Sequence, residues 1–285
     1  MLPTENRRLF VTDLDGTLLN RDSRVSDESA RIISMLSRRG VMITVATART
    51  PATVDTLLKD TIVRVPAIVM TGAAIWDKST CMFVDKRVIP DDIAAYVIDV
   101  CRRWDLRPFS YTVSDSGIVH TYFNGTPDAK ERKFISERSH LRLKRIHIDD
   151  PRTEGLRCVS GTVLLFCIGC RDRIDSAAAE LRESGLCSVS AYPDIFSPDM
   201  AYLEVFAPGV SKASALLRLK EMTGAESVTV FGDNLNDLSM MEAADMAVAV
   251  GNALPQVKEA ADVVIDNNDS DSVARYILEV SKTAF

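Results

Sequence analysis

Short apolar runs alternate with amphipathic stretches near both ends of the chain. In the first third, apolar runs at 9–14, 41–46 and 67–70 predict buried strands separated by segments with helical periodicity. The same alternation returns late in the sequence, where apolar runs lie at 228–231 and 246–250. Strands without polar positions, each followed by a helix, are typical of a parallel sheet that helices cover on both faces.

The middle of the chain follows a different pattern. Its strand-like segments are longer, several alternate polar and apolar positions, and helical stretches at 91–103 and 172–183 separate them. Alternation of this kind indicates an antiparallel sheet with one solvated face. We therefore predict an α/β fold with a Rossmann-like parallel-sheet core formed by 1–85 and 207–285, interrupted by an inserted α+β cap domain at 86–206.

Composition narrows the classes of protein to consider. A chain of 285 residues fits about two domains. With 34 basic and 40 acidic residues the net charge is −6, which disfavours nucleic-acid binding. The longest strongly apolar uncharged stretch, 158–170, is too short to cross a bilayer, so no membrane association is expected. Six scattered cysteines do not form a disulfide framework and favour the cytoplasm. We expect a monomer or a small homo-oligomer.

Carboxylates follow two predicted strands at the carboxyl ends, where parallel sheets place their sites. Asp13 and Asp15 end the first strand, and residues two apart on a strand project to the same side. Two carboxylates so close repel each other unless a proton or a cation intervenes. Asp233 and Asp237, after a late strand, bring the number to four. An all-oxygen ligand set of this kind suits Mg²⁺.

Three further residues offer donors to an anion. Gly16 lets the backbone turn sharply and present amide groups, Lys212 supplies a positive charge, and Thr47 supplies a hydroxyl. Together with the carboxylates they form the set that phosphoryl transfer to a carboxylate nucleophile requires. Taken singly, these segments also have structural interpretations. The loop at 13–17 could be a simple turn, the loop at 232–237 could be a turn and a helix cap, and Lys212 could be a solvated helix lysine.

These segments resemble the four sequence motifs of the haloacid dehalogenase (HAD) superfamily. The matching stretches are Asp13-Leu-Asp15-Gly-Thr17-Leu, Thr47-Ala-Arg49, Lys212 in Pro208-Gly-Val-Ser-Lys-Ala, and Gly232-Asp233-Asn-Leu-Asn236-Asp237-Leu-Ser-Met240. More narrowly, the chain resembles the Cof-type phosphatases, to which Thr71-Gly-Ala-Ala-Ile-Trp-Asp77 and Val248-Ala-Val-Gly251-Asn252-Ala253 are also similar. The middle of the chain matches that family's large α/β cap in length and position.

The resemblance implies a role for each motif residue. Asp13 would be the nucleophile that takes the phosphoryl group as an aspartyl phosphate, and Asp15 would act first as acid and then as base. Mg²⁺ would be held by Asp13, the backbone carbonyl of Asp15 and Asp233, with Asp237 close by or bound through water. The residues expected to bind the phosphate are Gly16, Thr47, Ala48, Lys212 and Asn236.

Three positions depart from the family pattern. Ala48 and Asp271 stand where glycine is usual, and Thr71 stands where asparagine is usual. If position 48 requires a positive φ, its alanine is strained and the phosphate loop is altered. Arg49 has two interpretations, a contact to the cap or substrate and a structural salt bridge.

The cap is expected to select the leaving group. Candidate contacts are Phe109, Tyr111, Asp194, Phe196 and Tyr202. The basic segment 130–145 is interpreted as a solvated helix face followed by a strand, although it would also suit an acidic substrate.

The resemblance therefore implies a Mg²⁺-dependent phosphatase acting on small phosphorylated metabolites, with sugar phosphates the expected class. A phosphomutase shares the same core motifs and would return the phosphoryl group to the substrate instead of to water. A phospho-aspartate switch and a non-enzymatic binding protein are alternatives from other classes. The inserted domain and the spacing of Asp13 and Asp15 argue against the switch, and the complete set of motif carboxylates argues against the binding protein.

Overall fold

Two compact units make up the chain. The computed structural model describes residues 7–153, 157–194 and 197–282. The core unit contains Met1–Val84 and Ser211–Phe285, and the inserted unit contains Asp85–Val210. The core unit is thus assembled from two stretches that lie far apart in the sequence.

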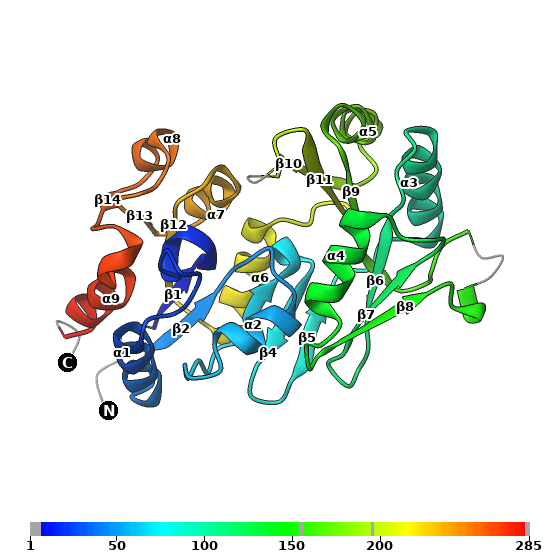
Figure 1. The fold of residues 1–285 in the computed structure, drawn as a ribbon. Helices are drawn as coiled ribbons and strands as arrows, with labels where there is room; N and C mark the ends of the chain where they lie inside the picture. The colour runs from blue at the N-terminus through cyan, green and yellow to red at the C-terminus, as the bar shows by residue number, and fades with distance from the viewer. Residues whose placement is uncertain (1–6, 154–156, 195–196, 283–285) are drawn as a thin grey trace. The chain divides into compact units, whose positions relative to one another are not determined.

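A five-stranded parallel sheet forms the centre of the core unit (Figure 1). Its strands, in spatial order, are β14 (Val263–Val264), β13 (Met246–Ala249), β12 (Ser227–Gly232), β1 (Arg8–Thr12) and β2 (Met42–Val45). The central strand β1 pairs in parallel with β12 on one side and β2 on the other, so the two stretches of the unit join there. Leu9 and Val11 are fully buried, as expected for a strand with helices on both faces. The predicted parallel-sheet core is confirmed.

Helices and short helical turns connect these strands. They are η1 (Leu14–Leu18, a π-helical turn), α1 (Asp27–Arg38), α2 (Pro51–Leu57), η2 (Met70–Gly72), α6 (Lys212–Thr223), η4 (Leu235–Asp237), α7 (Leu238–Glu242), α8 (Pro255–Glu259), η5 (Asn268–Ser270) and α9 (Ser272–Lys282). Side-chain caps account for two of the helix starts. Ser26 accepts a hydrogen bond from the amide of Ser29 at the start of α1, and Ser211 forms a capping box with Ser214 at the start of α6.

A small antiparallel sheet extends the core unit. It consists of β3 (Ala67–Val69), β4 (Ala74–Asp77) and β5 (Met82–Lys86). A bridge between Ala46 and Ile68 joins it to the edge of the parallel sheet beyond β2.

The inserted unit contains a six-stranded, mainly antiparallel sheet. Its strands, in spatial order, are β10 (Ser188–Pro193), β11 (Met200–Phe206), β9 (Thr162–Cys170), β6 (Phe109–Val113), β7 (Val119–Phe123) and β8 (Lys144–Ile148), of which β7 and β8 run parallel. The helical elements are α3 (Asp91–Arg103), α4 (Ala129–Arg138), η3 (Pro151–Thr153) and α5 (Arg171–Ser184). The inserted α+β domain is thus observed as predicted.

Helices lie on both faces of this sheet. On one face, Phe134 of α4 packs against Phe166 of β9, with ring centroids 5.0 Å apart. The next residue of β9, Cys167, points the other way and contacts Cys101 of α3. Helix α5 packs against both α3 and β9. Thus α4 covers one face, while α3 and α5 cover part of the other.

One basic residue of segment 130–145 does not follow the predicted solvated pattern. Lys144, at the start of β8, is 2% exposed, and its ammonium lies 4.1 Å from the centre of the Tyr111 ring. Burial lowers the pKa of Lys144 to about 7. The sequence placed Lys144 near the solvent because its neighbours are charged, whereas strand pairing turns it into the aromatic cluster beneath α4.

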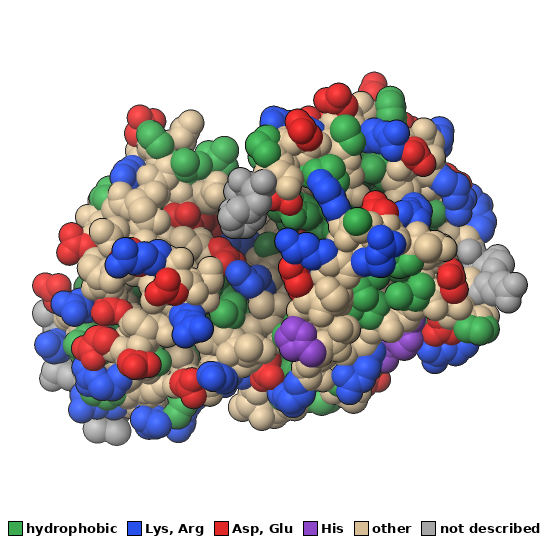
Figure 2. Space-filling model, viewed as in Figure 1, with side chains coloured by type: hydrophobic (Ala, Val, Ile, Leu, Met, Phe, Trp, Pro, Cys, Tyr) green, Lys and Arg blue, Asp and Glu red, His purple; other side chains and the backbone are tan. Residues whose placement is uncertain are grey.

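No helix in the described part of the chain is long and apolar enough to cross a membrane. On the face drawn in Figure 2, acidic and basic side chains intermingle over the core unit.

The three departures from the family pattern have different structural consequences. Ala48 does not have a positive φ, so the strain expected there is absent. Asp271 has φ +58°, and both Ser26 and Ser29 donate hydrogen bonds to its carboxylate. Thr71, inside η2, has φ +55°, a conformation that disfavours β-branched residues.

Thr71→Asn is expected to stabilise the protein. Asparagine occupies the left-handed region more readily than threonine, so the free energy of unfolding should rise by about 1 kcal/mol. Urea denaturation of purified protein measures the change. Thr71→Val keeps the β-branch and is the matched control, for which no gain is expected. Equal stability of the Asn and Val variants would contradict backbone strain at this position.

Candidate active site

Asp13 lies directly after the central strand of the core sheet. Its amide donates to the carbonyl of Phe231 on β12, at 2.9 Å, so the backbone of Asp13 continues the pairing of β1 with β12. Its side chain is buried. The chain then turns through η1, where Gly16 has φ +78°. A Cβ at Gly16 would lie 2.5 Å from an oxygen of Asp233, so only glycine fits between the two loops.

Asp233 and Asp237 follow the neighbouring strand β12. Both oxygens of Asp237 are engaged, because Oδ2 accepts from the amides of Asp233 and Asn234 and Oδ1 accepts from Lys212. The hydrogen bonds from the amides of Asp233 and Asn234 to Oδ2 are 3.1 and 3.2 Å long and lie at the start of η4. The helical segment after β12 therefore begins with the tight 3₁₀ turn η4, directly before α7. Asp233 is held from the other side by the hydroxyl of Thr17, at 2.8 Å.

Lys212 is the buried cation of the site. It is the first residue of α6 and is 1% exposed. Its ammonium donates to Oδ1 of Asp13 and, at 2.7 Å, to Oδ1 of Asp237. Burial alone would lower the pKa of Lys212, but the attraction of the two carboxylates raises it above its ordinary value. The interpretation of Lys212 as a solvated helix lysine is therefore wrong.

The three aspartates form an acidic cluster that fits a metal ion. One carboxylate oxygen from each of Asp13, Asp233 and Asp237 lies within 4.8 Å of the others. Against these three acids Lys212 supplies a single positive charge. Burial raises the pKa of Asp13 to about 8, even though Lys212 opposes the shift, and burial raises that of Asp233 to about 6. The cluster is therefore short of positive charge, which a divalent cation would supply.

Asp15 does not join this cluster, contrary to the expectation that four carboxylates gather. Arg49 binds the Asp15 carboxylate with two hydrogen bonds, from Nε at 2.7 Å and from Nη2 at 2.6 Å. The rule that residues two apart share a side applies to extended strands, and β1 ends at Thr12, one residue before Asp13. Of the two interpretations of Arg49, the structure shows the salt bridge.

The other predicted phosphate-binding residues surround the end of the sheet. Thr47 is buried after β2; its amide donates to Ile68, and its hydroxyl accepts from the amide of Arg49. Ala48 lies between Thr47 and Arg49 in the same loop. Asn236 is exposed within η4.

Asn252 is a residue of the site to which sequence reasoning gave no role. Its side-chain amide donates to the carbonyl of Gly16 at 2.7 Å, and its Oδ1 accepts from the amide of Asn268. Asn252 thus braces the turn η1 directly after Asp15. The sequence feature that could have pointed to Asn252 is its position in the Gly251-Asn252-Ala253 segment, directly after a predicted strand.

The candidate leaving-group contacts in the inserted unit have differing exposure. Phe109 and Tyr111 lie in the core of that unit, at 0% and 3% exposure, which leaves them no surface for a ligand. Tyr202 is partly exposed, and its hydroxyl donates to Asp194 at 2.7 Å. Phe196 lies outside the described residues.

Comparisons with known proteins show a hydrolase family and phosphatases to which this chain is similar. A model of the haloacid dehalogenase-like hydrolase family matches residues 10–277. The 5-amino-6-(5-phospho-D-ribitylamino)uracil phosphatase YcsE of Bacillus subtilis is 29% identical over 273 residues, which cover 95% of this chain and 94% of that protein. Pyridoxal phosphate phosphatase YbhA of Escherichia coli is 24% identical over 286 residues, covering 95% and 97% of the two chains. A solved structure from Thermotoga maritima has a TM-score of 0.75 at 27% identity, covering 96% and 97%.

Without metal, the protein should lose stability as the pH rises from about 4 to about 8. The raised pKa values of Asp13 and Asp233 mean that the folded state binds more protons than the unfolded state in this window. The loss should amount to several kcal/mol, measured by urea unfolding in EDTA. Asp233→Asn should flatten the slope, whereas Asp245→Asn, at an exposed acid of the same unit, should not. A stability that rises through this window would contradict the assigned shifts.

Two ion pairs of the site should differ strongly in their contribution to stability. Lys212→Met leaves buried carboxylates without their cation and should cost about 3–5 kcal/mol. Arg49→Met removes a partly exposed pair and should cost no more than about 1 kcal/mol. Urea unfolding in EDTA at pH 8 measures both variants, and equal costs would contradict the buried position of Lys212.

Proposed function

Because the chain belongs to the haloacid dehalogenase-like hydrolase family, we propose that it is a Mg²⁺-dependent phosphatase that hydrolyses small phosphorylated metabolites through an aspartyl phosphate. The observation that carries the proposal is the acidic cluster at the end of β1 and β12. A nucleophile, Asp13, is held there by buried Lys212 within 4.8 Å of the oxygens of Asp233 and Asp237. This arrangement meets the main need of phosphoryl transfer, which is positioning and charge compensation.

The residues of the cluster fit Mg²⁺. Their donors are carboxylate oxygens, which this ion prefers, and the cluster lacks the positive charge that the ion brings. Asp13 and Asp233 would hold it, together with the carbonyl of Asp15, and Asp237 would bind directly or through water. When bound, Mg²⁺ offsets the repulsion between the anionic nucleophile and the anionic phosphate.

Asp13 acts as the nucleophile in the proposed reaction. Lys212 engages Oδ1 and fixes the rotamer, so Oδ2 is the oxygen available to attack phosphorus. As the new O–P bond forms, the bond to the leaving oxygen breaks and Asp15 donates a proton to that oxygen. A water molecule then attacks phosphorus, Asp15 takes its proton, and the O–P bond to Asp13 breaks to release inorganic phosphate.

Arg49 limits what Asp15 can do in the arrangement described here. Both carboxylate oxygens of Asp15 accept hydrogen bonds from the guanidinium. To transfer a proton, Asp15 must therefore release one of these contacts when substrate binds. Amides of the loop at Gly16 and Ala48, with Thr47, Lys212 and Asn236, would bind the phosphate oxygens.

The inserted unit, with boundaries near 86 and 206, is proposed to select the substrate. The two named relatives act on a phosphoribityl compound and on pyridoxal phosphate, so phosphatases similar to this chain take small phosphate monoesters of different shapes. We propose sugar phosphates as the class of substrate.

The six cysteines are free thiols, which supports the cytoplasm as the compartment. A monomer or small homo-oligomer is the expected state.

Asp13→Asn should reduce phosphatase activity at least about a thousandfold while the protein stays folded, because the amide is a poor nucleophile. Release of p-nitrophenol from p-nitrophenyl phosphate measures the loss, and circular dichroism checks the fold. Asp245→Asn, at an exposed acid paired with Lys220, is the matched control and should keep full activity. Normal turnover by Asp13→Asn would overturn the assignment of the nucleophile.

Removal of divalent metal should stop turnover, and Mg²⁺ should restore it. Phosphate release from a panel of phosphorylated metabolites, measured before and after EDTA, tests this together with the substrate class. Asp233→Asn should raise the Mg²⁺ concentration needed for half-maximal activity at least about tenfold. Activity that survives EDTA would contradict the metal assignment.

The same assays distinguish the alternative functions. Isomerised substrate without free phosphate would identify a phosphomutase, and a long-lived aspartyl phosphate would identify a switch.

A further inference from the structure

Lys144 carries a buried amino group in the inserted unit that the proposed phosphatase chemistry does not use. The residue is 2% exposed and lies on β8, beside Val119 of β7. Its side chain extends across β7 until the nitrogen lies over the Tyr111 ring of β6, 4.1 Å from the ring centre. The ring of Phe134, on the covering helix α4, has its centre 5.9 Å from the same nitrogen. Aromatic rings therefore enclose the amino group on two sides.

No acid balances the charge of this amino group. Among the described residues Lys144 makes no ion pair and its side chain donates no hydrogen bond, so its contacts are with the rings. Glu204, a buried acid on the same face of the sheet, accepts a hydrogen bond from Tyr192 instead, at 3.0 Å. A lone ammonium is costly to bury, because rings replace only part of its hydration. The site therefore favours the neutral amine.

The groups that face Lys144 act in the same direction. Burial, and to a smaller extent the positive charge of Arg138 on α4, lower the pKa of Lys144 to about 7. Tyr111 adds no charge, because burial raises the pKa of its phenol. The neutral nitrogen has a free lone pair. Lys144 is thus a nucleophile at a pH at which exposed lysines, with a pKa of about 10.4, remain protonated.

Two neighbours can bind an anion that forms on this nitrogen. The hydroxyl of Thr121 is buried and has no hydrogen-bond partner among the described residues. Thr121 lies on β7 directly opposite Tyr111, on the strand that the Lys144 side chain crosses. Arg138 supplies a positive charge, which at present is paired only with Glu137, an exposed acid, at 3.1 Å. Because a buried hydroxyl is costly to leave without a partner, this pocket lacks an acceptor.

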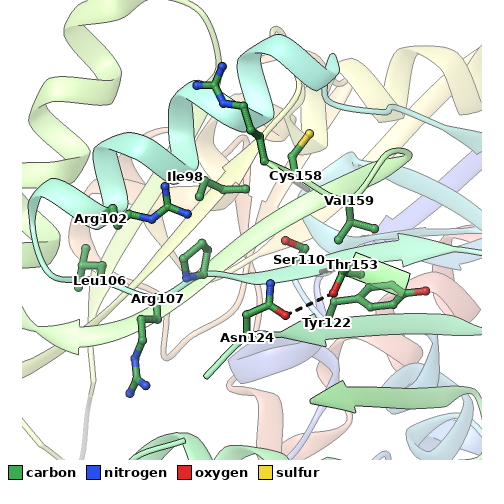
Figure 3. Close-up of a pocket in the computed structure, with 12 residues that line it drawn as sticks. Ile98, Arg102, Leu106, Arg107, Ser110, Tyr122, Asn124, Thr153, Cys158 and Val159 are labelled. Carbon is green, nitrogen blue, oxygen red and sulfur yellow. Dashed lines mark hydrogen bonds between the residues drawn. The ribbon is translucent and has the colours of Figure 1, made fainter. Parts of the chain in front are cut away.

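The pocket around Lys144 is separate from the cavity on the opposite face of the sheet. Neighbours along a strand point to opposite faces, so Ser110 and Tyr122 point away from Lys144 and line that cavity, of about 140 Å³ (Figure 3). None of the residues around Lys144 lines it, and none belongs to the candidate active site. Since only 2% of Lys144 is exposed, a molecule that reacts with its nitrogen must be small.

We propose that the amine of Lys144 reacts with dissolved carbon dioxide and forms a carbamate. The nitrogen lone pair attacks the carbon of CO₂, a C–N bond forms, and the electron pair of one C=O bond moves onto oxygen. The nitrogen then loses a proton to water, which leaves a carboxylate on Nζ. CO₂ is small, uncharged and apolar, so it can reach an amine enclosed by rings. The new carboxylate binds Arg138 and accepts a hydrogen bond from Thr121.

Trapping with triethyloxonium tests this reaction, because ethylation makes a carbamate stable enough for peptide mass spectrometry. The full-length protein is incubated with isotope-labelled bicarbonate at about pH 8, and the trapped label is expected on Lys144. Lys133, an exposed lysine of α4, should carry at least about tenfold less label, because its amine is protonated at this pH. At about pH 6 and the same pressure of CO₂, protonation of Lys144 should lower its label at least about fivefold.

Variants locate the anion-binding groups. Arg138→Gln removes the cation beside the carbamate and should lower the label on Lys144 at least about fivefold. Arg132→Gln, at an exposed arginine of the same helix, is the matched control and should leave the label unchanged. Asp13→Asn should also leave it unchanged, which separates this reaction from the candidate active site. Both arginines reach the surface, so neither variant depends on refilling the core.

Three results would overturn the proposal. The first is the absence of trapped label on Lys144 in the wild type, and the second is equal label on Lys144 and Lys133. The third is an Arg138→Gln variant that carries as much label as the wild type, since the carbamate would then form without the cation assigned to it.

Discussion

One buried ammonium group, that of Lys212, determines how the core unit is arranged around its site. Lys212 binds Asp13 at the end of β1 and Asp237 after β12, and all three side chains are almost completely buried. A charged group survives such burial only when its partners are fixed at hydrogen-bond distance. The start of α6, the pairing of β1 with β12 and the tight turn η4 must therefore all be correct together.

The same cluster shows why stability and function oppose each other here. Three carboxylates around one ammonium are unfavourable without a further cation, and the raised pKa values of Asp13 and Asp233 reflect this. The surrounding loops hold the acids in place nonetheless. Gly16 allows the close approach of Asp233, Thr17 binds Asp233, and Asn252 braces the turn. Three acids held this close to one ammonium are an arrangement that suits a divalent cation.

The inserted unit uses the two faces of its sheet differently. Beneath α4 the face is aromatic and closed, and it buries even the ammonium of Lys144. The opposite face is covered by α3 and α5 only in part, and Tyr122 and Ser110 line a cavity on it. The sheet is therefore wider than its helical cover on this face.

The fold class and the core built from two stretches could be predicted from the sequence, because both depend on local signals, and the same signals pointed to the candidate site residues. Runs of apolar residues specify buried parallel strands, and Asp13, Lys212 and Asp233 lie at their ends or at helix starts. Only the tertiary structure decided which of these side chains meet. Asp15 was expected beside Asp13 but binds Arg49, since the chain leaves the strand geometry before it reaches Asp15. Lys144 was predicted to belong to a solvated segment, yet it is buried. Burial of a charged side chain depends on partners that are distant in sequence, and no local pattern records them.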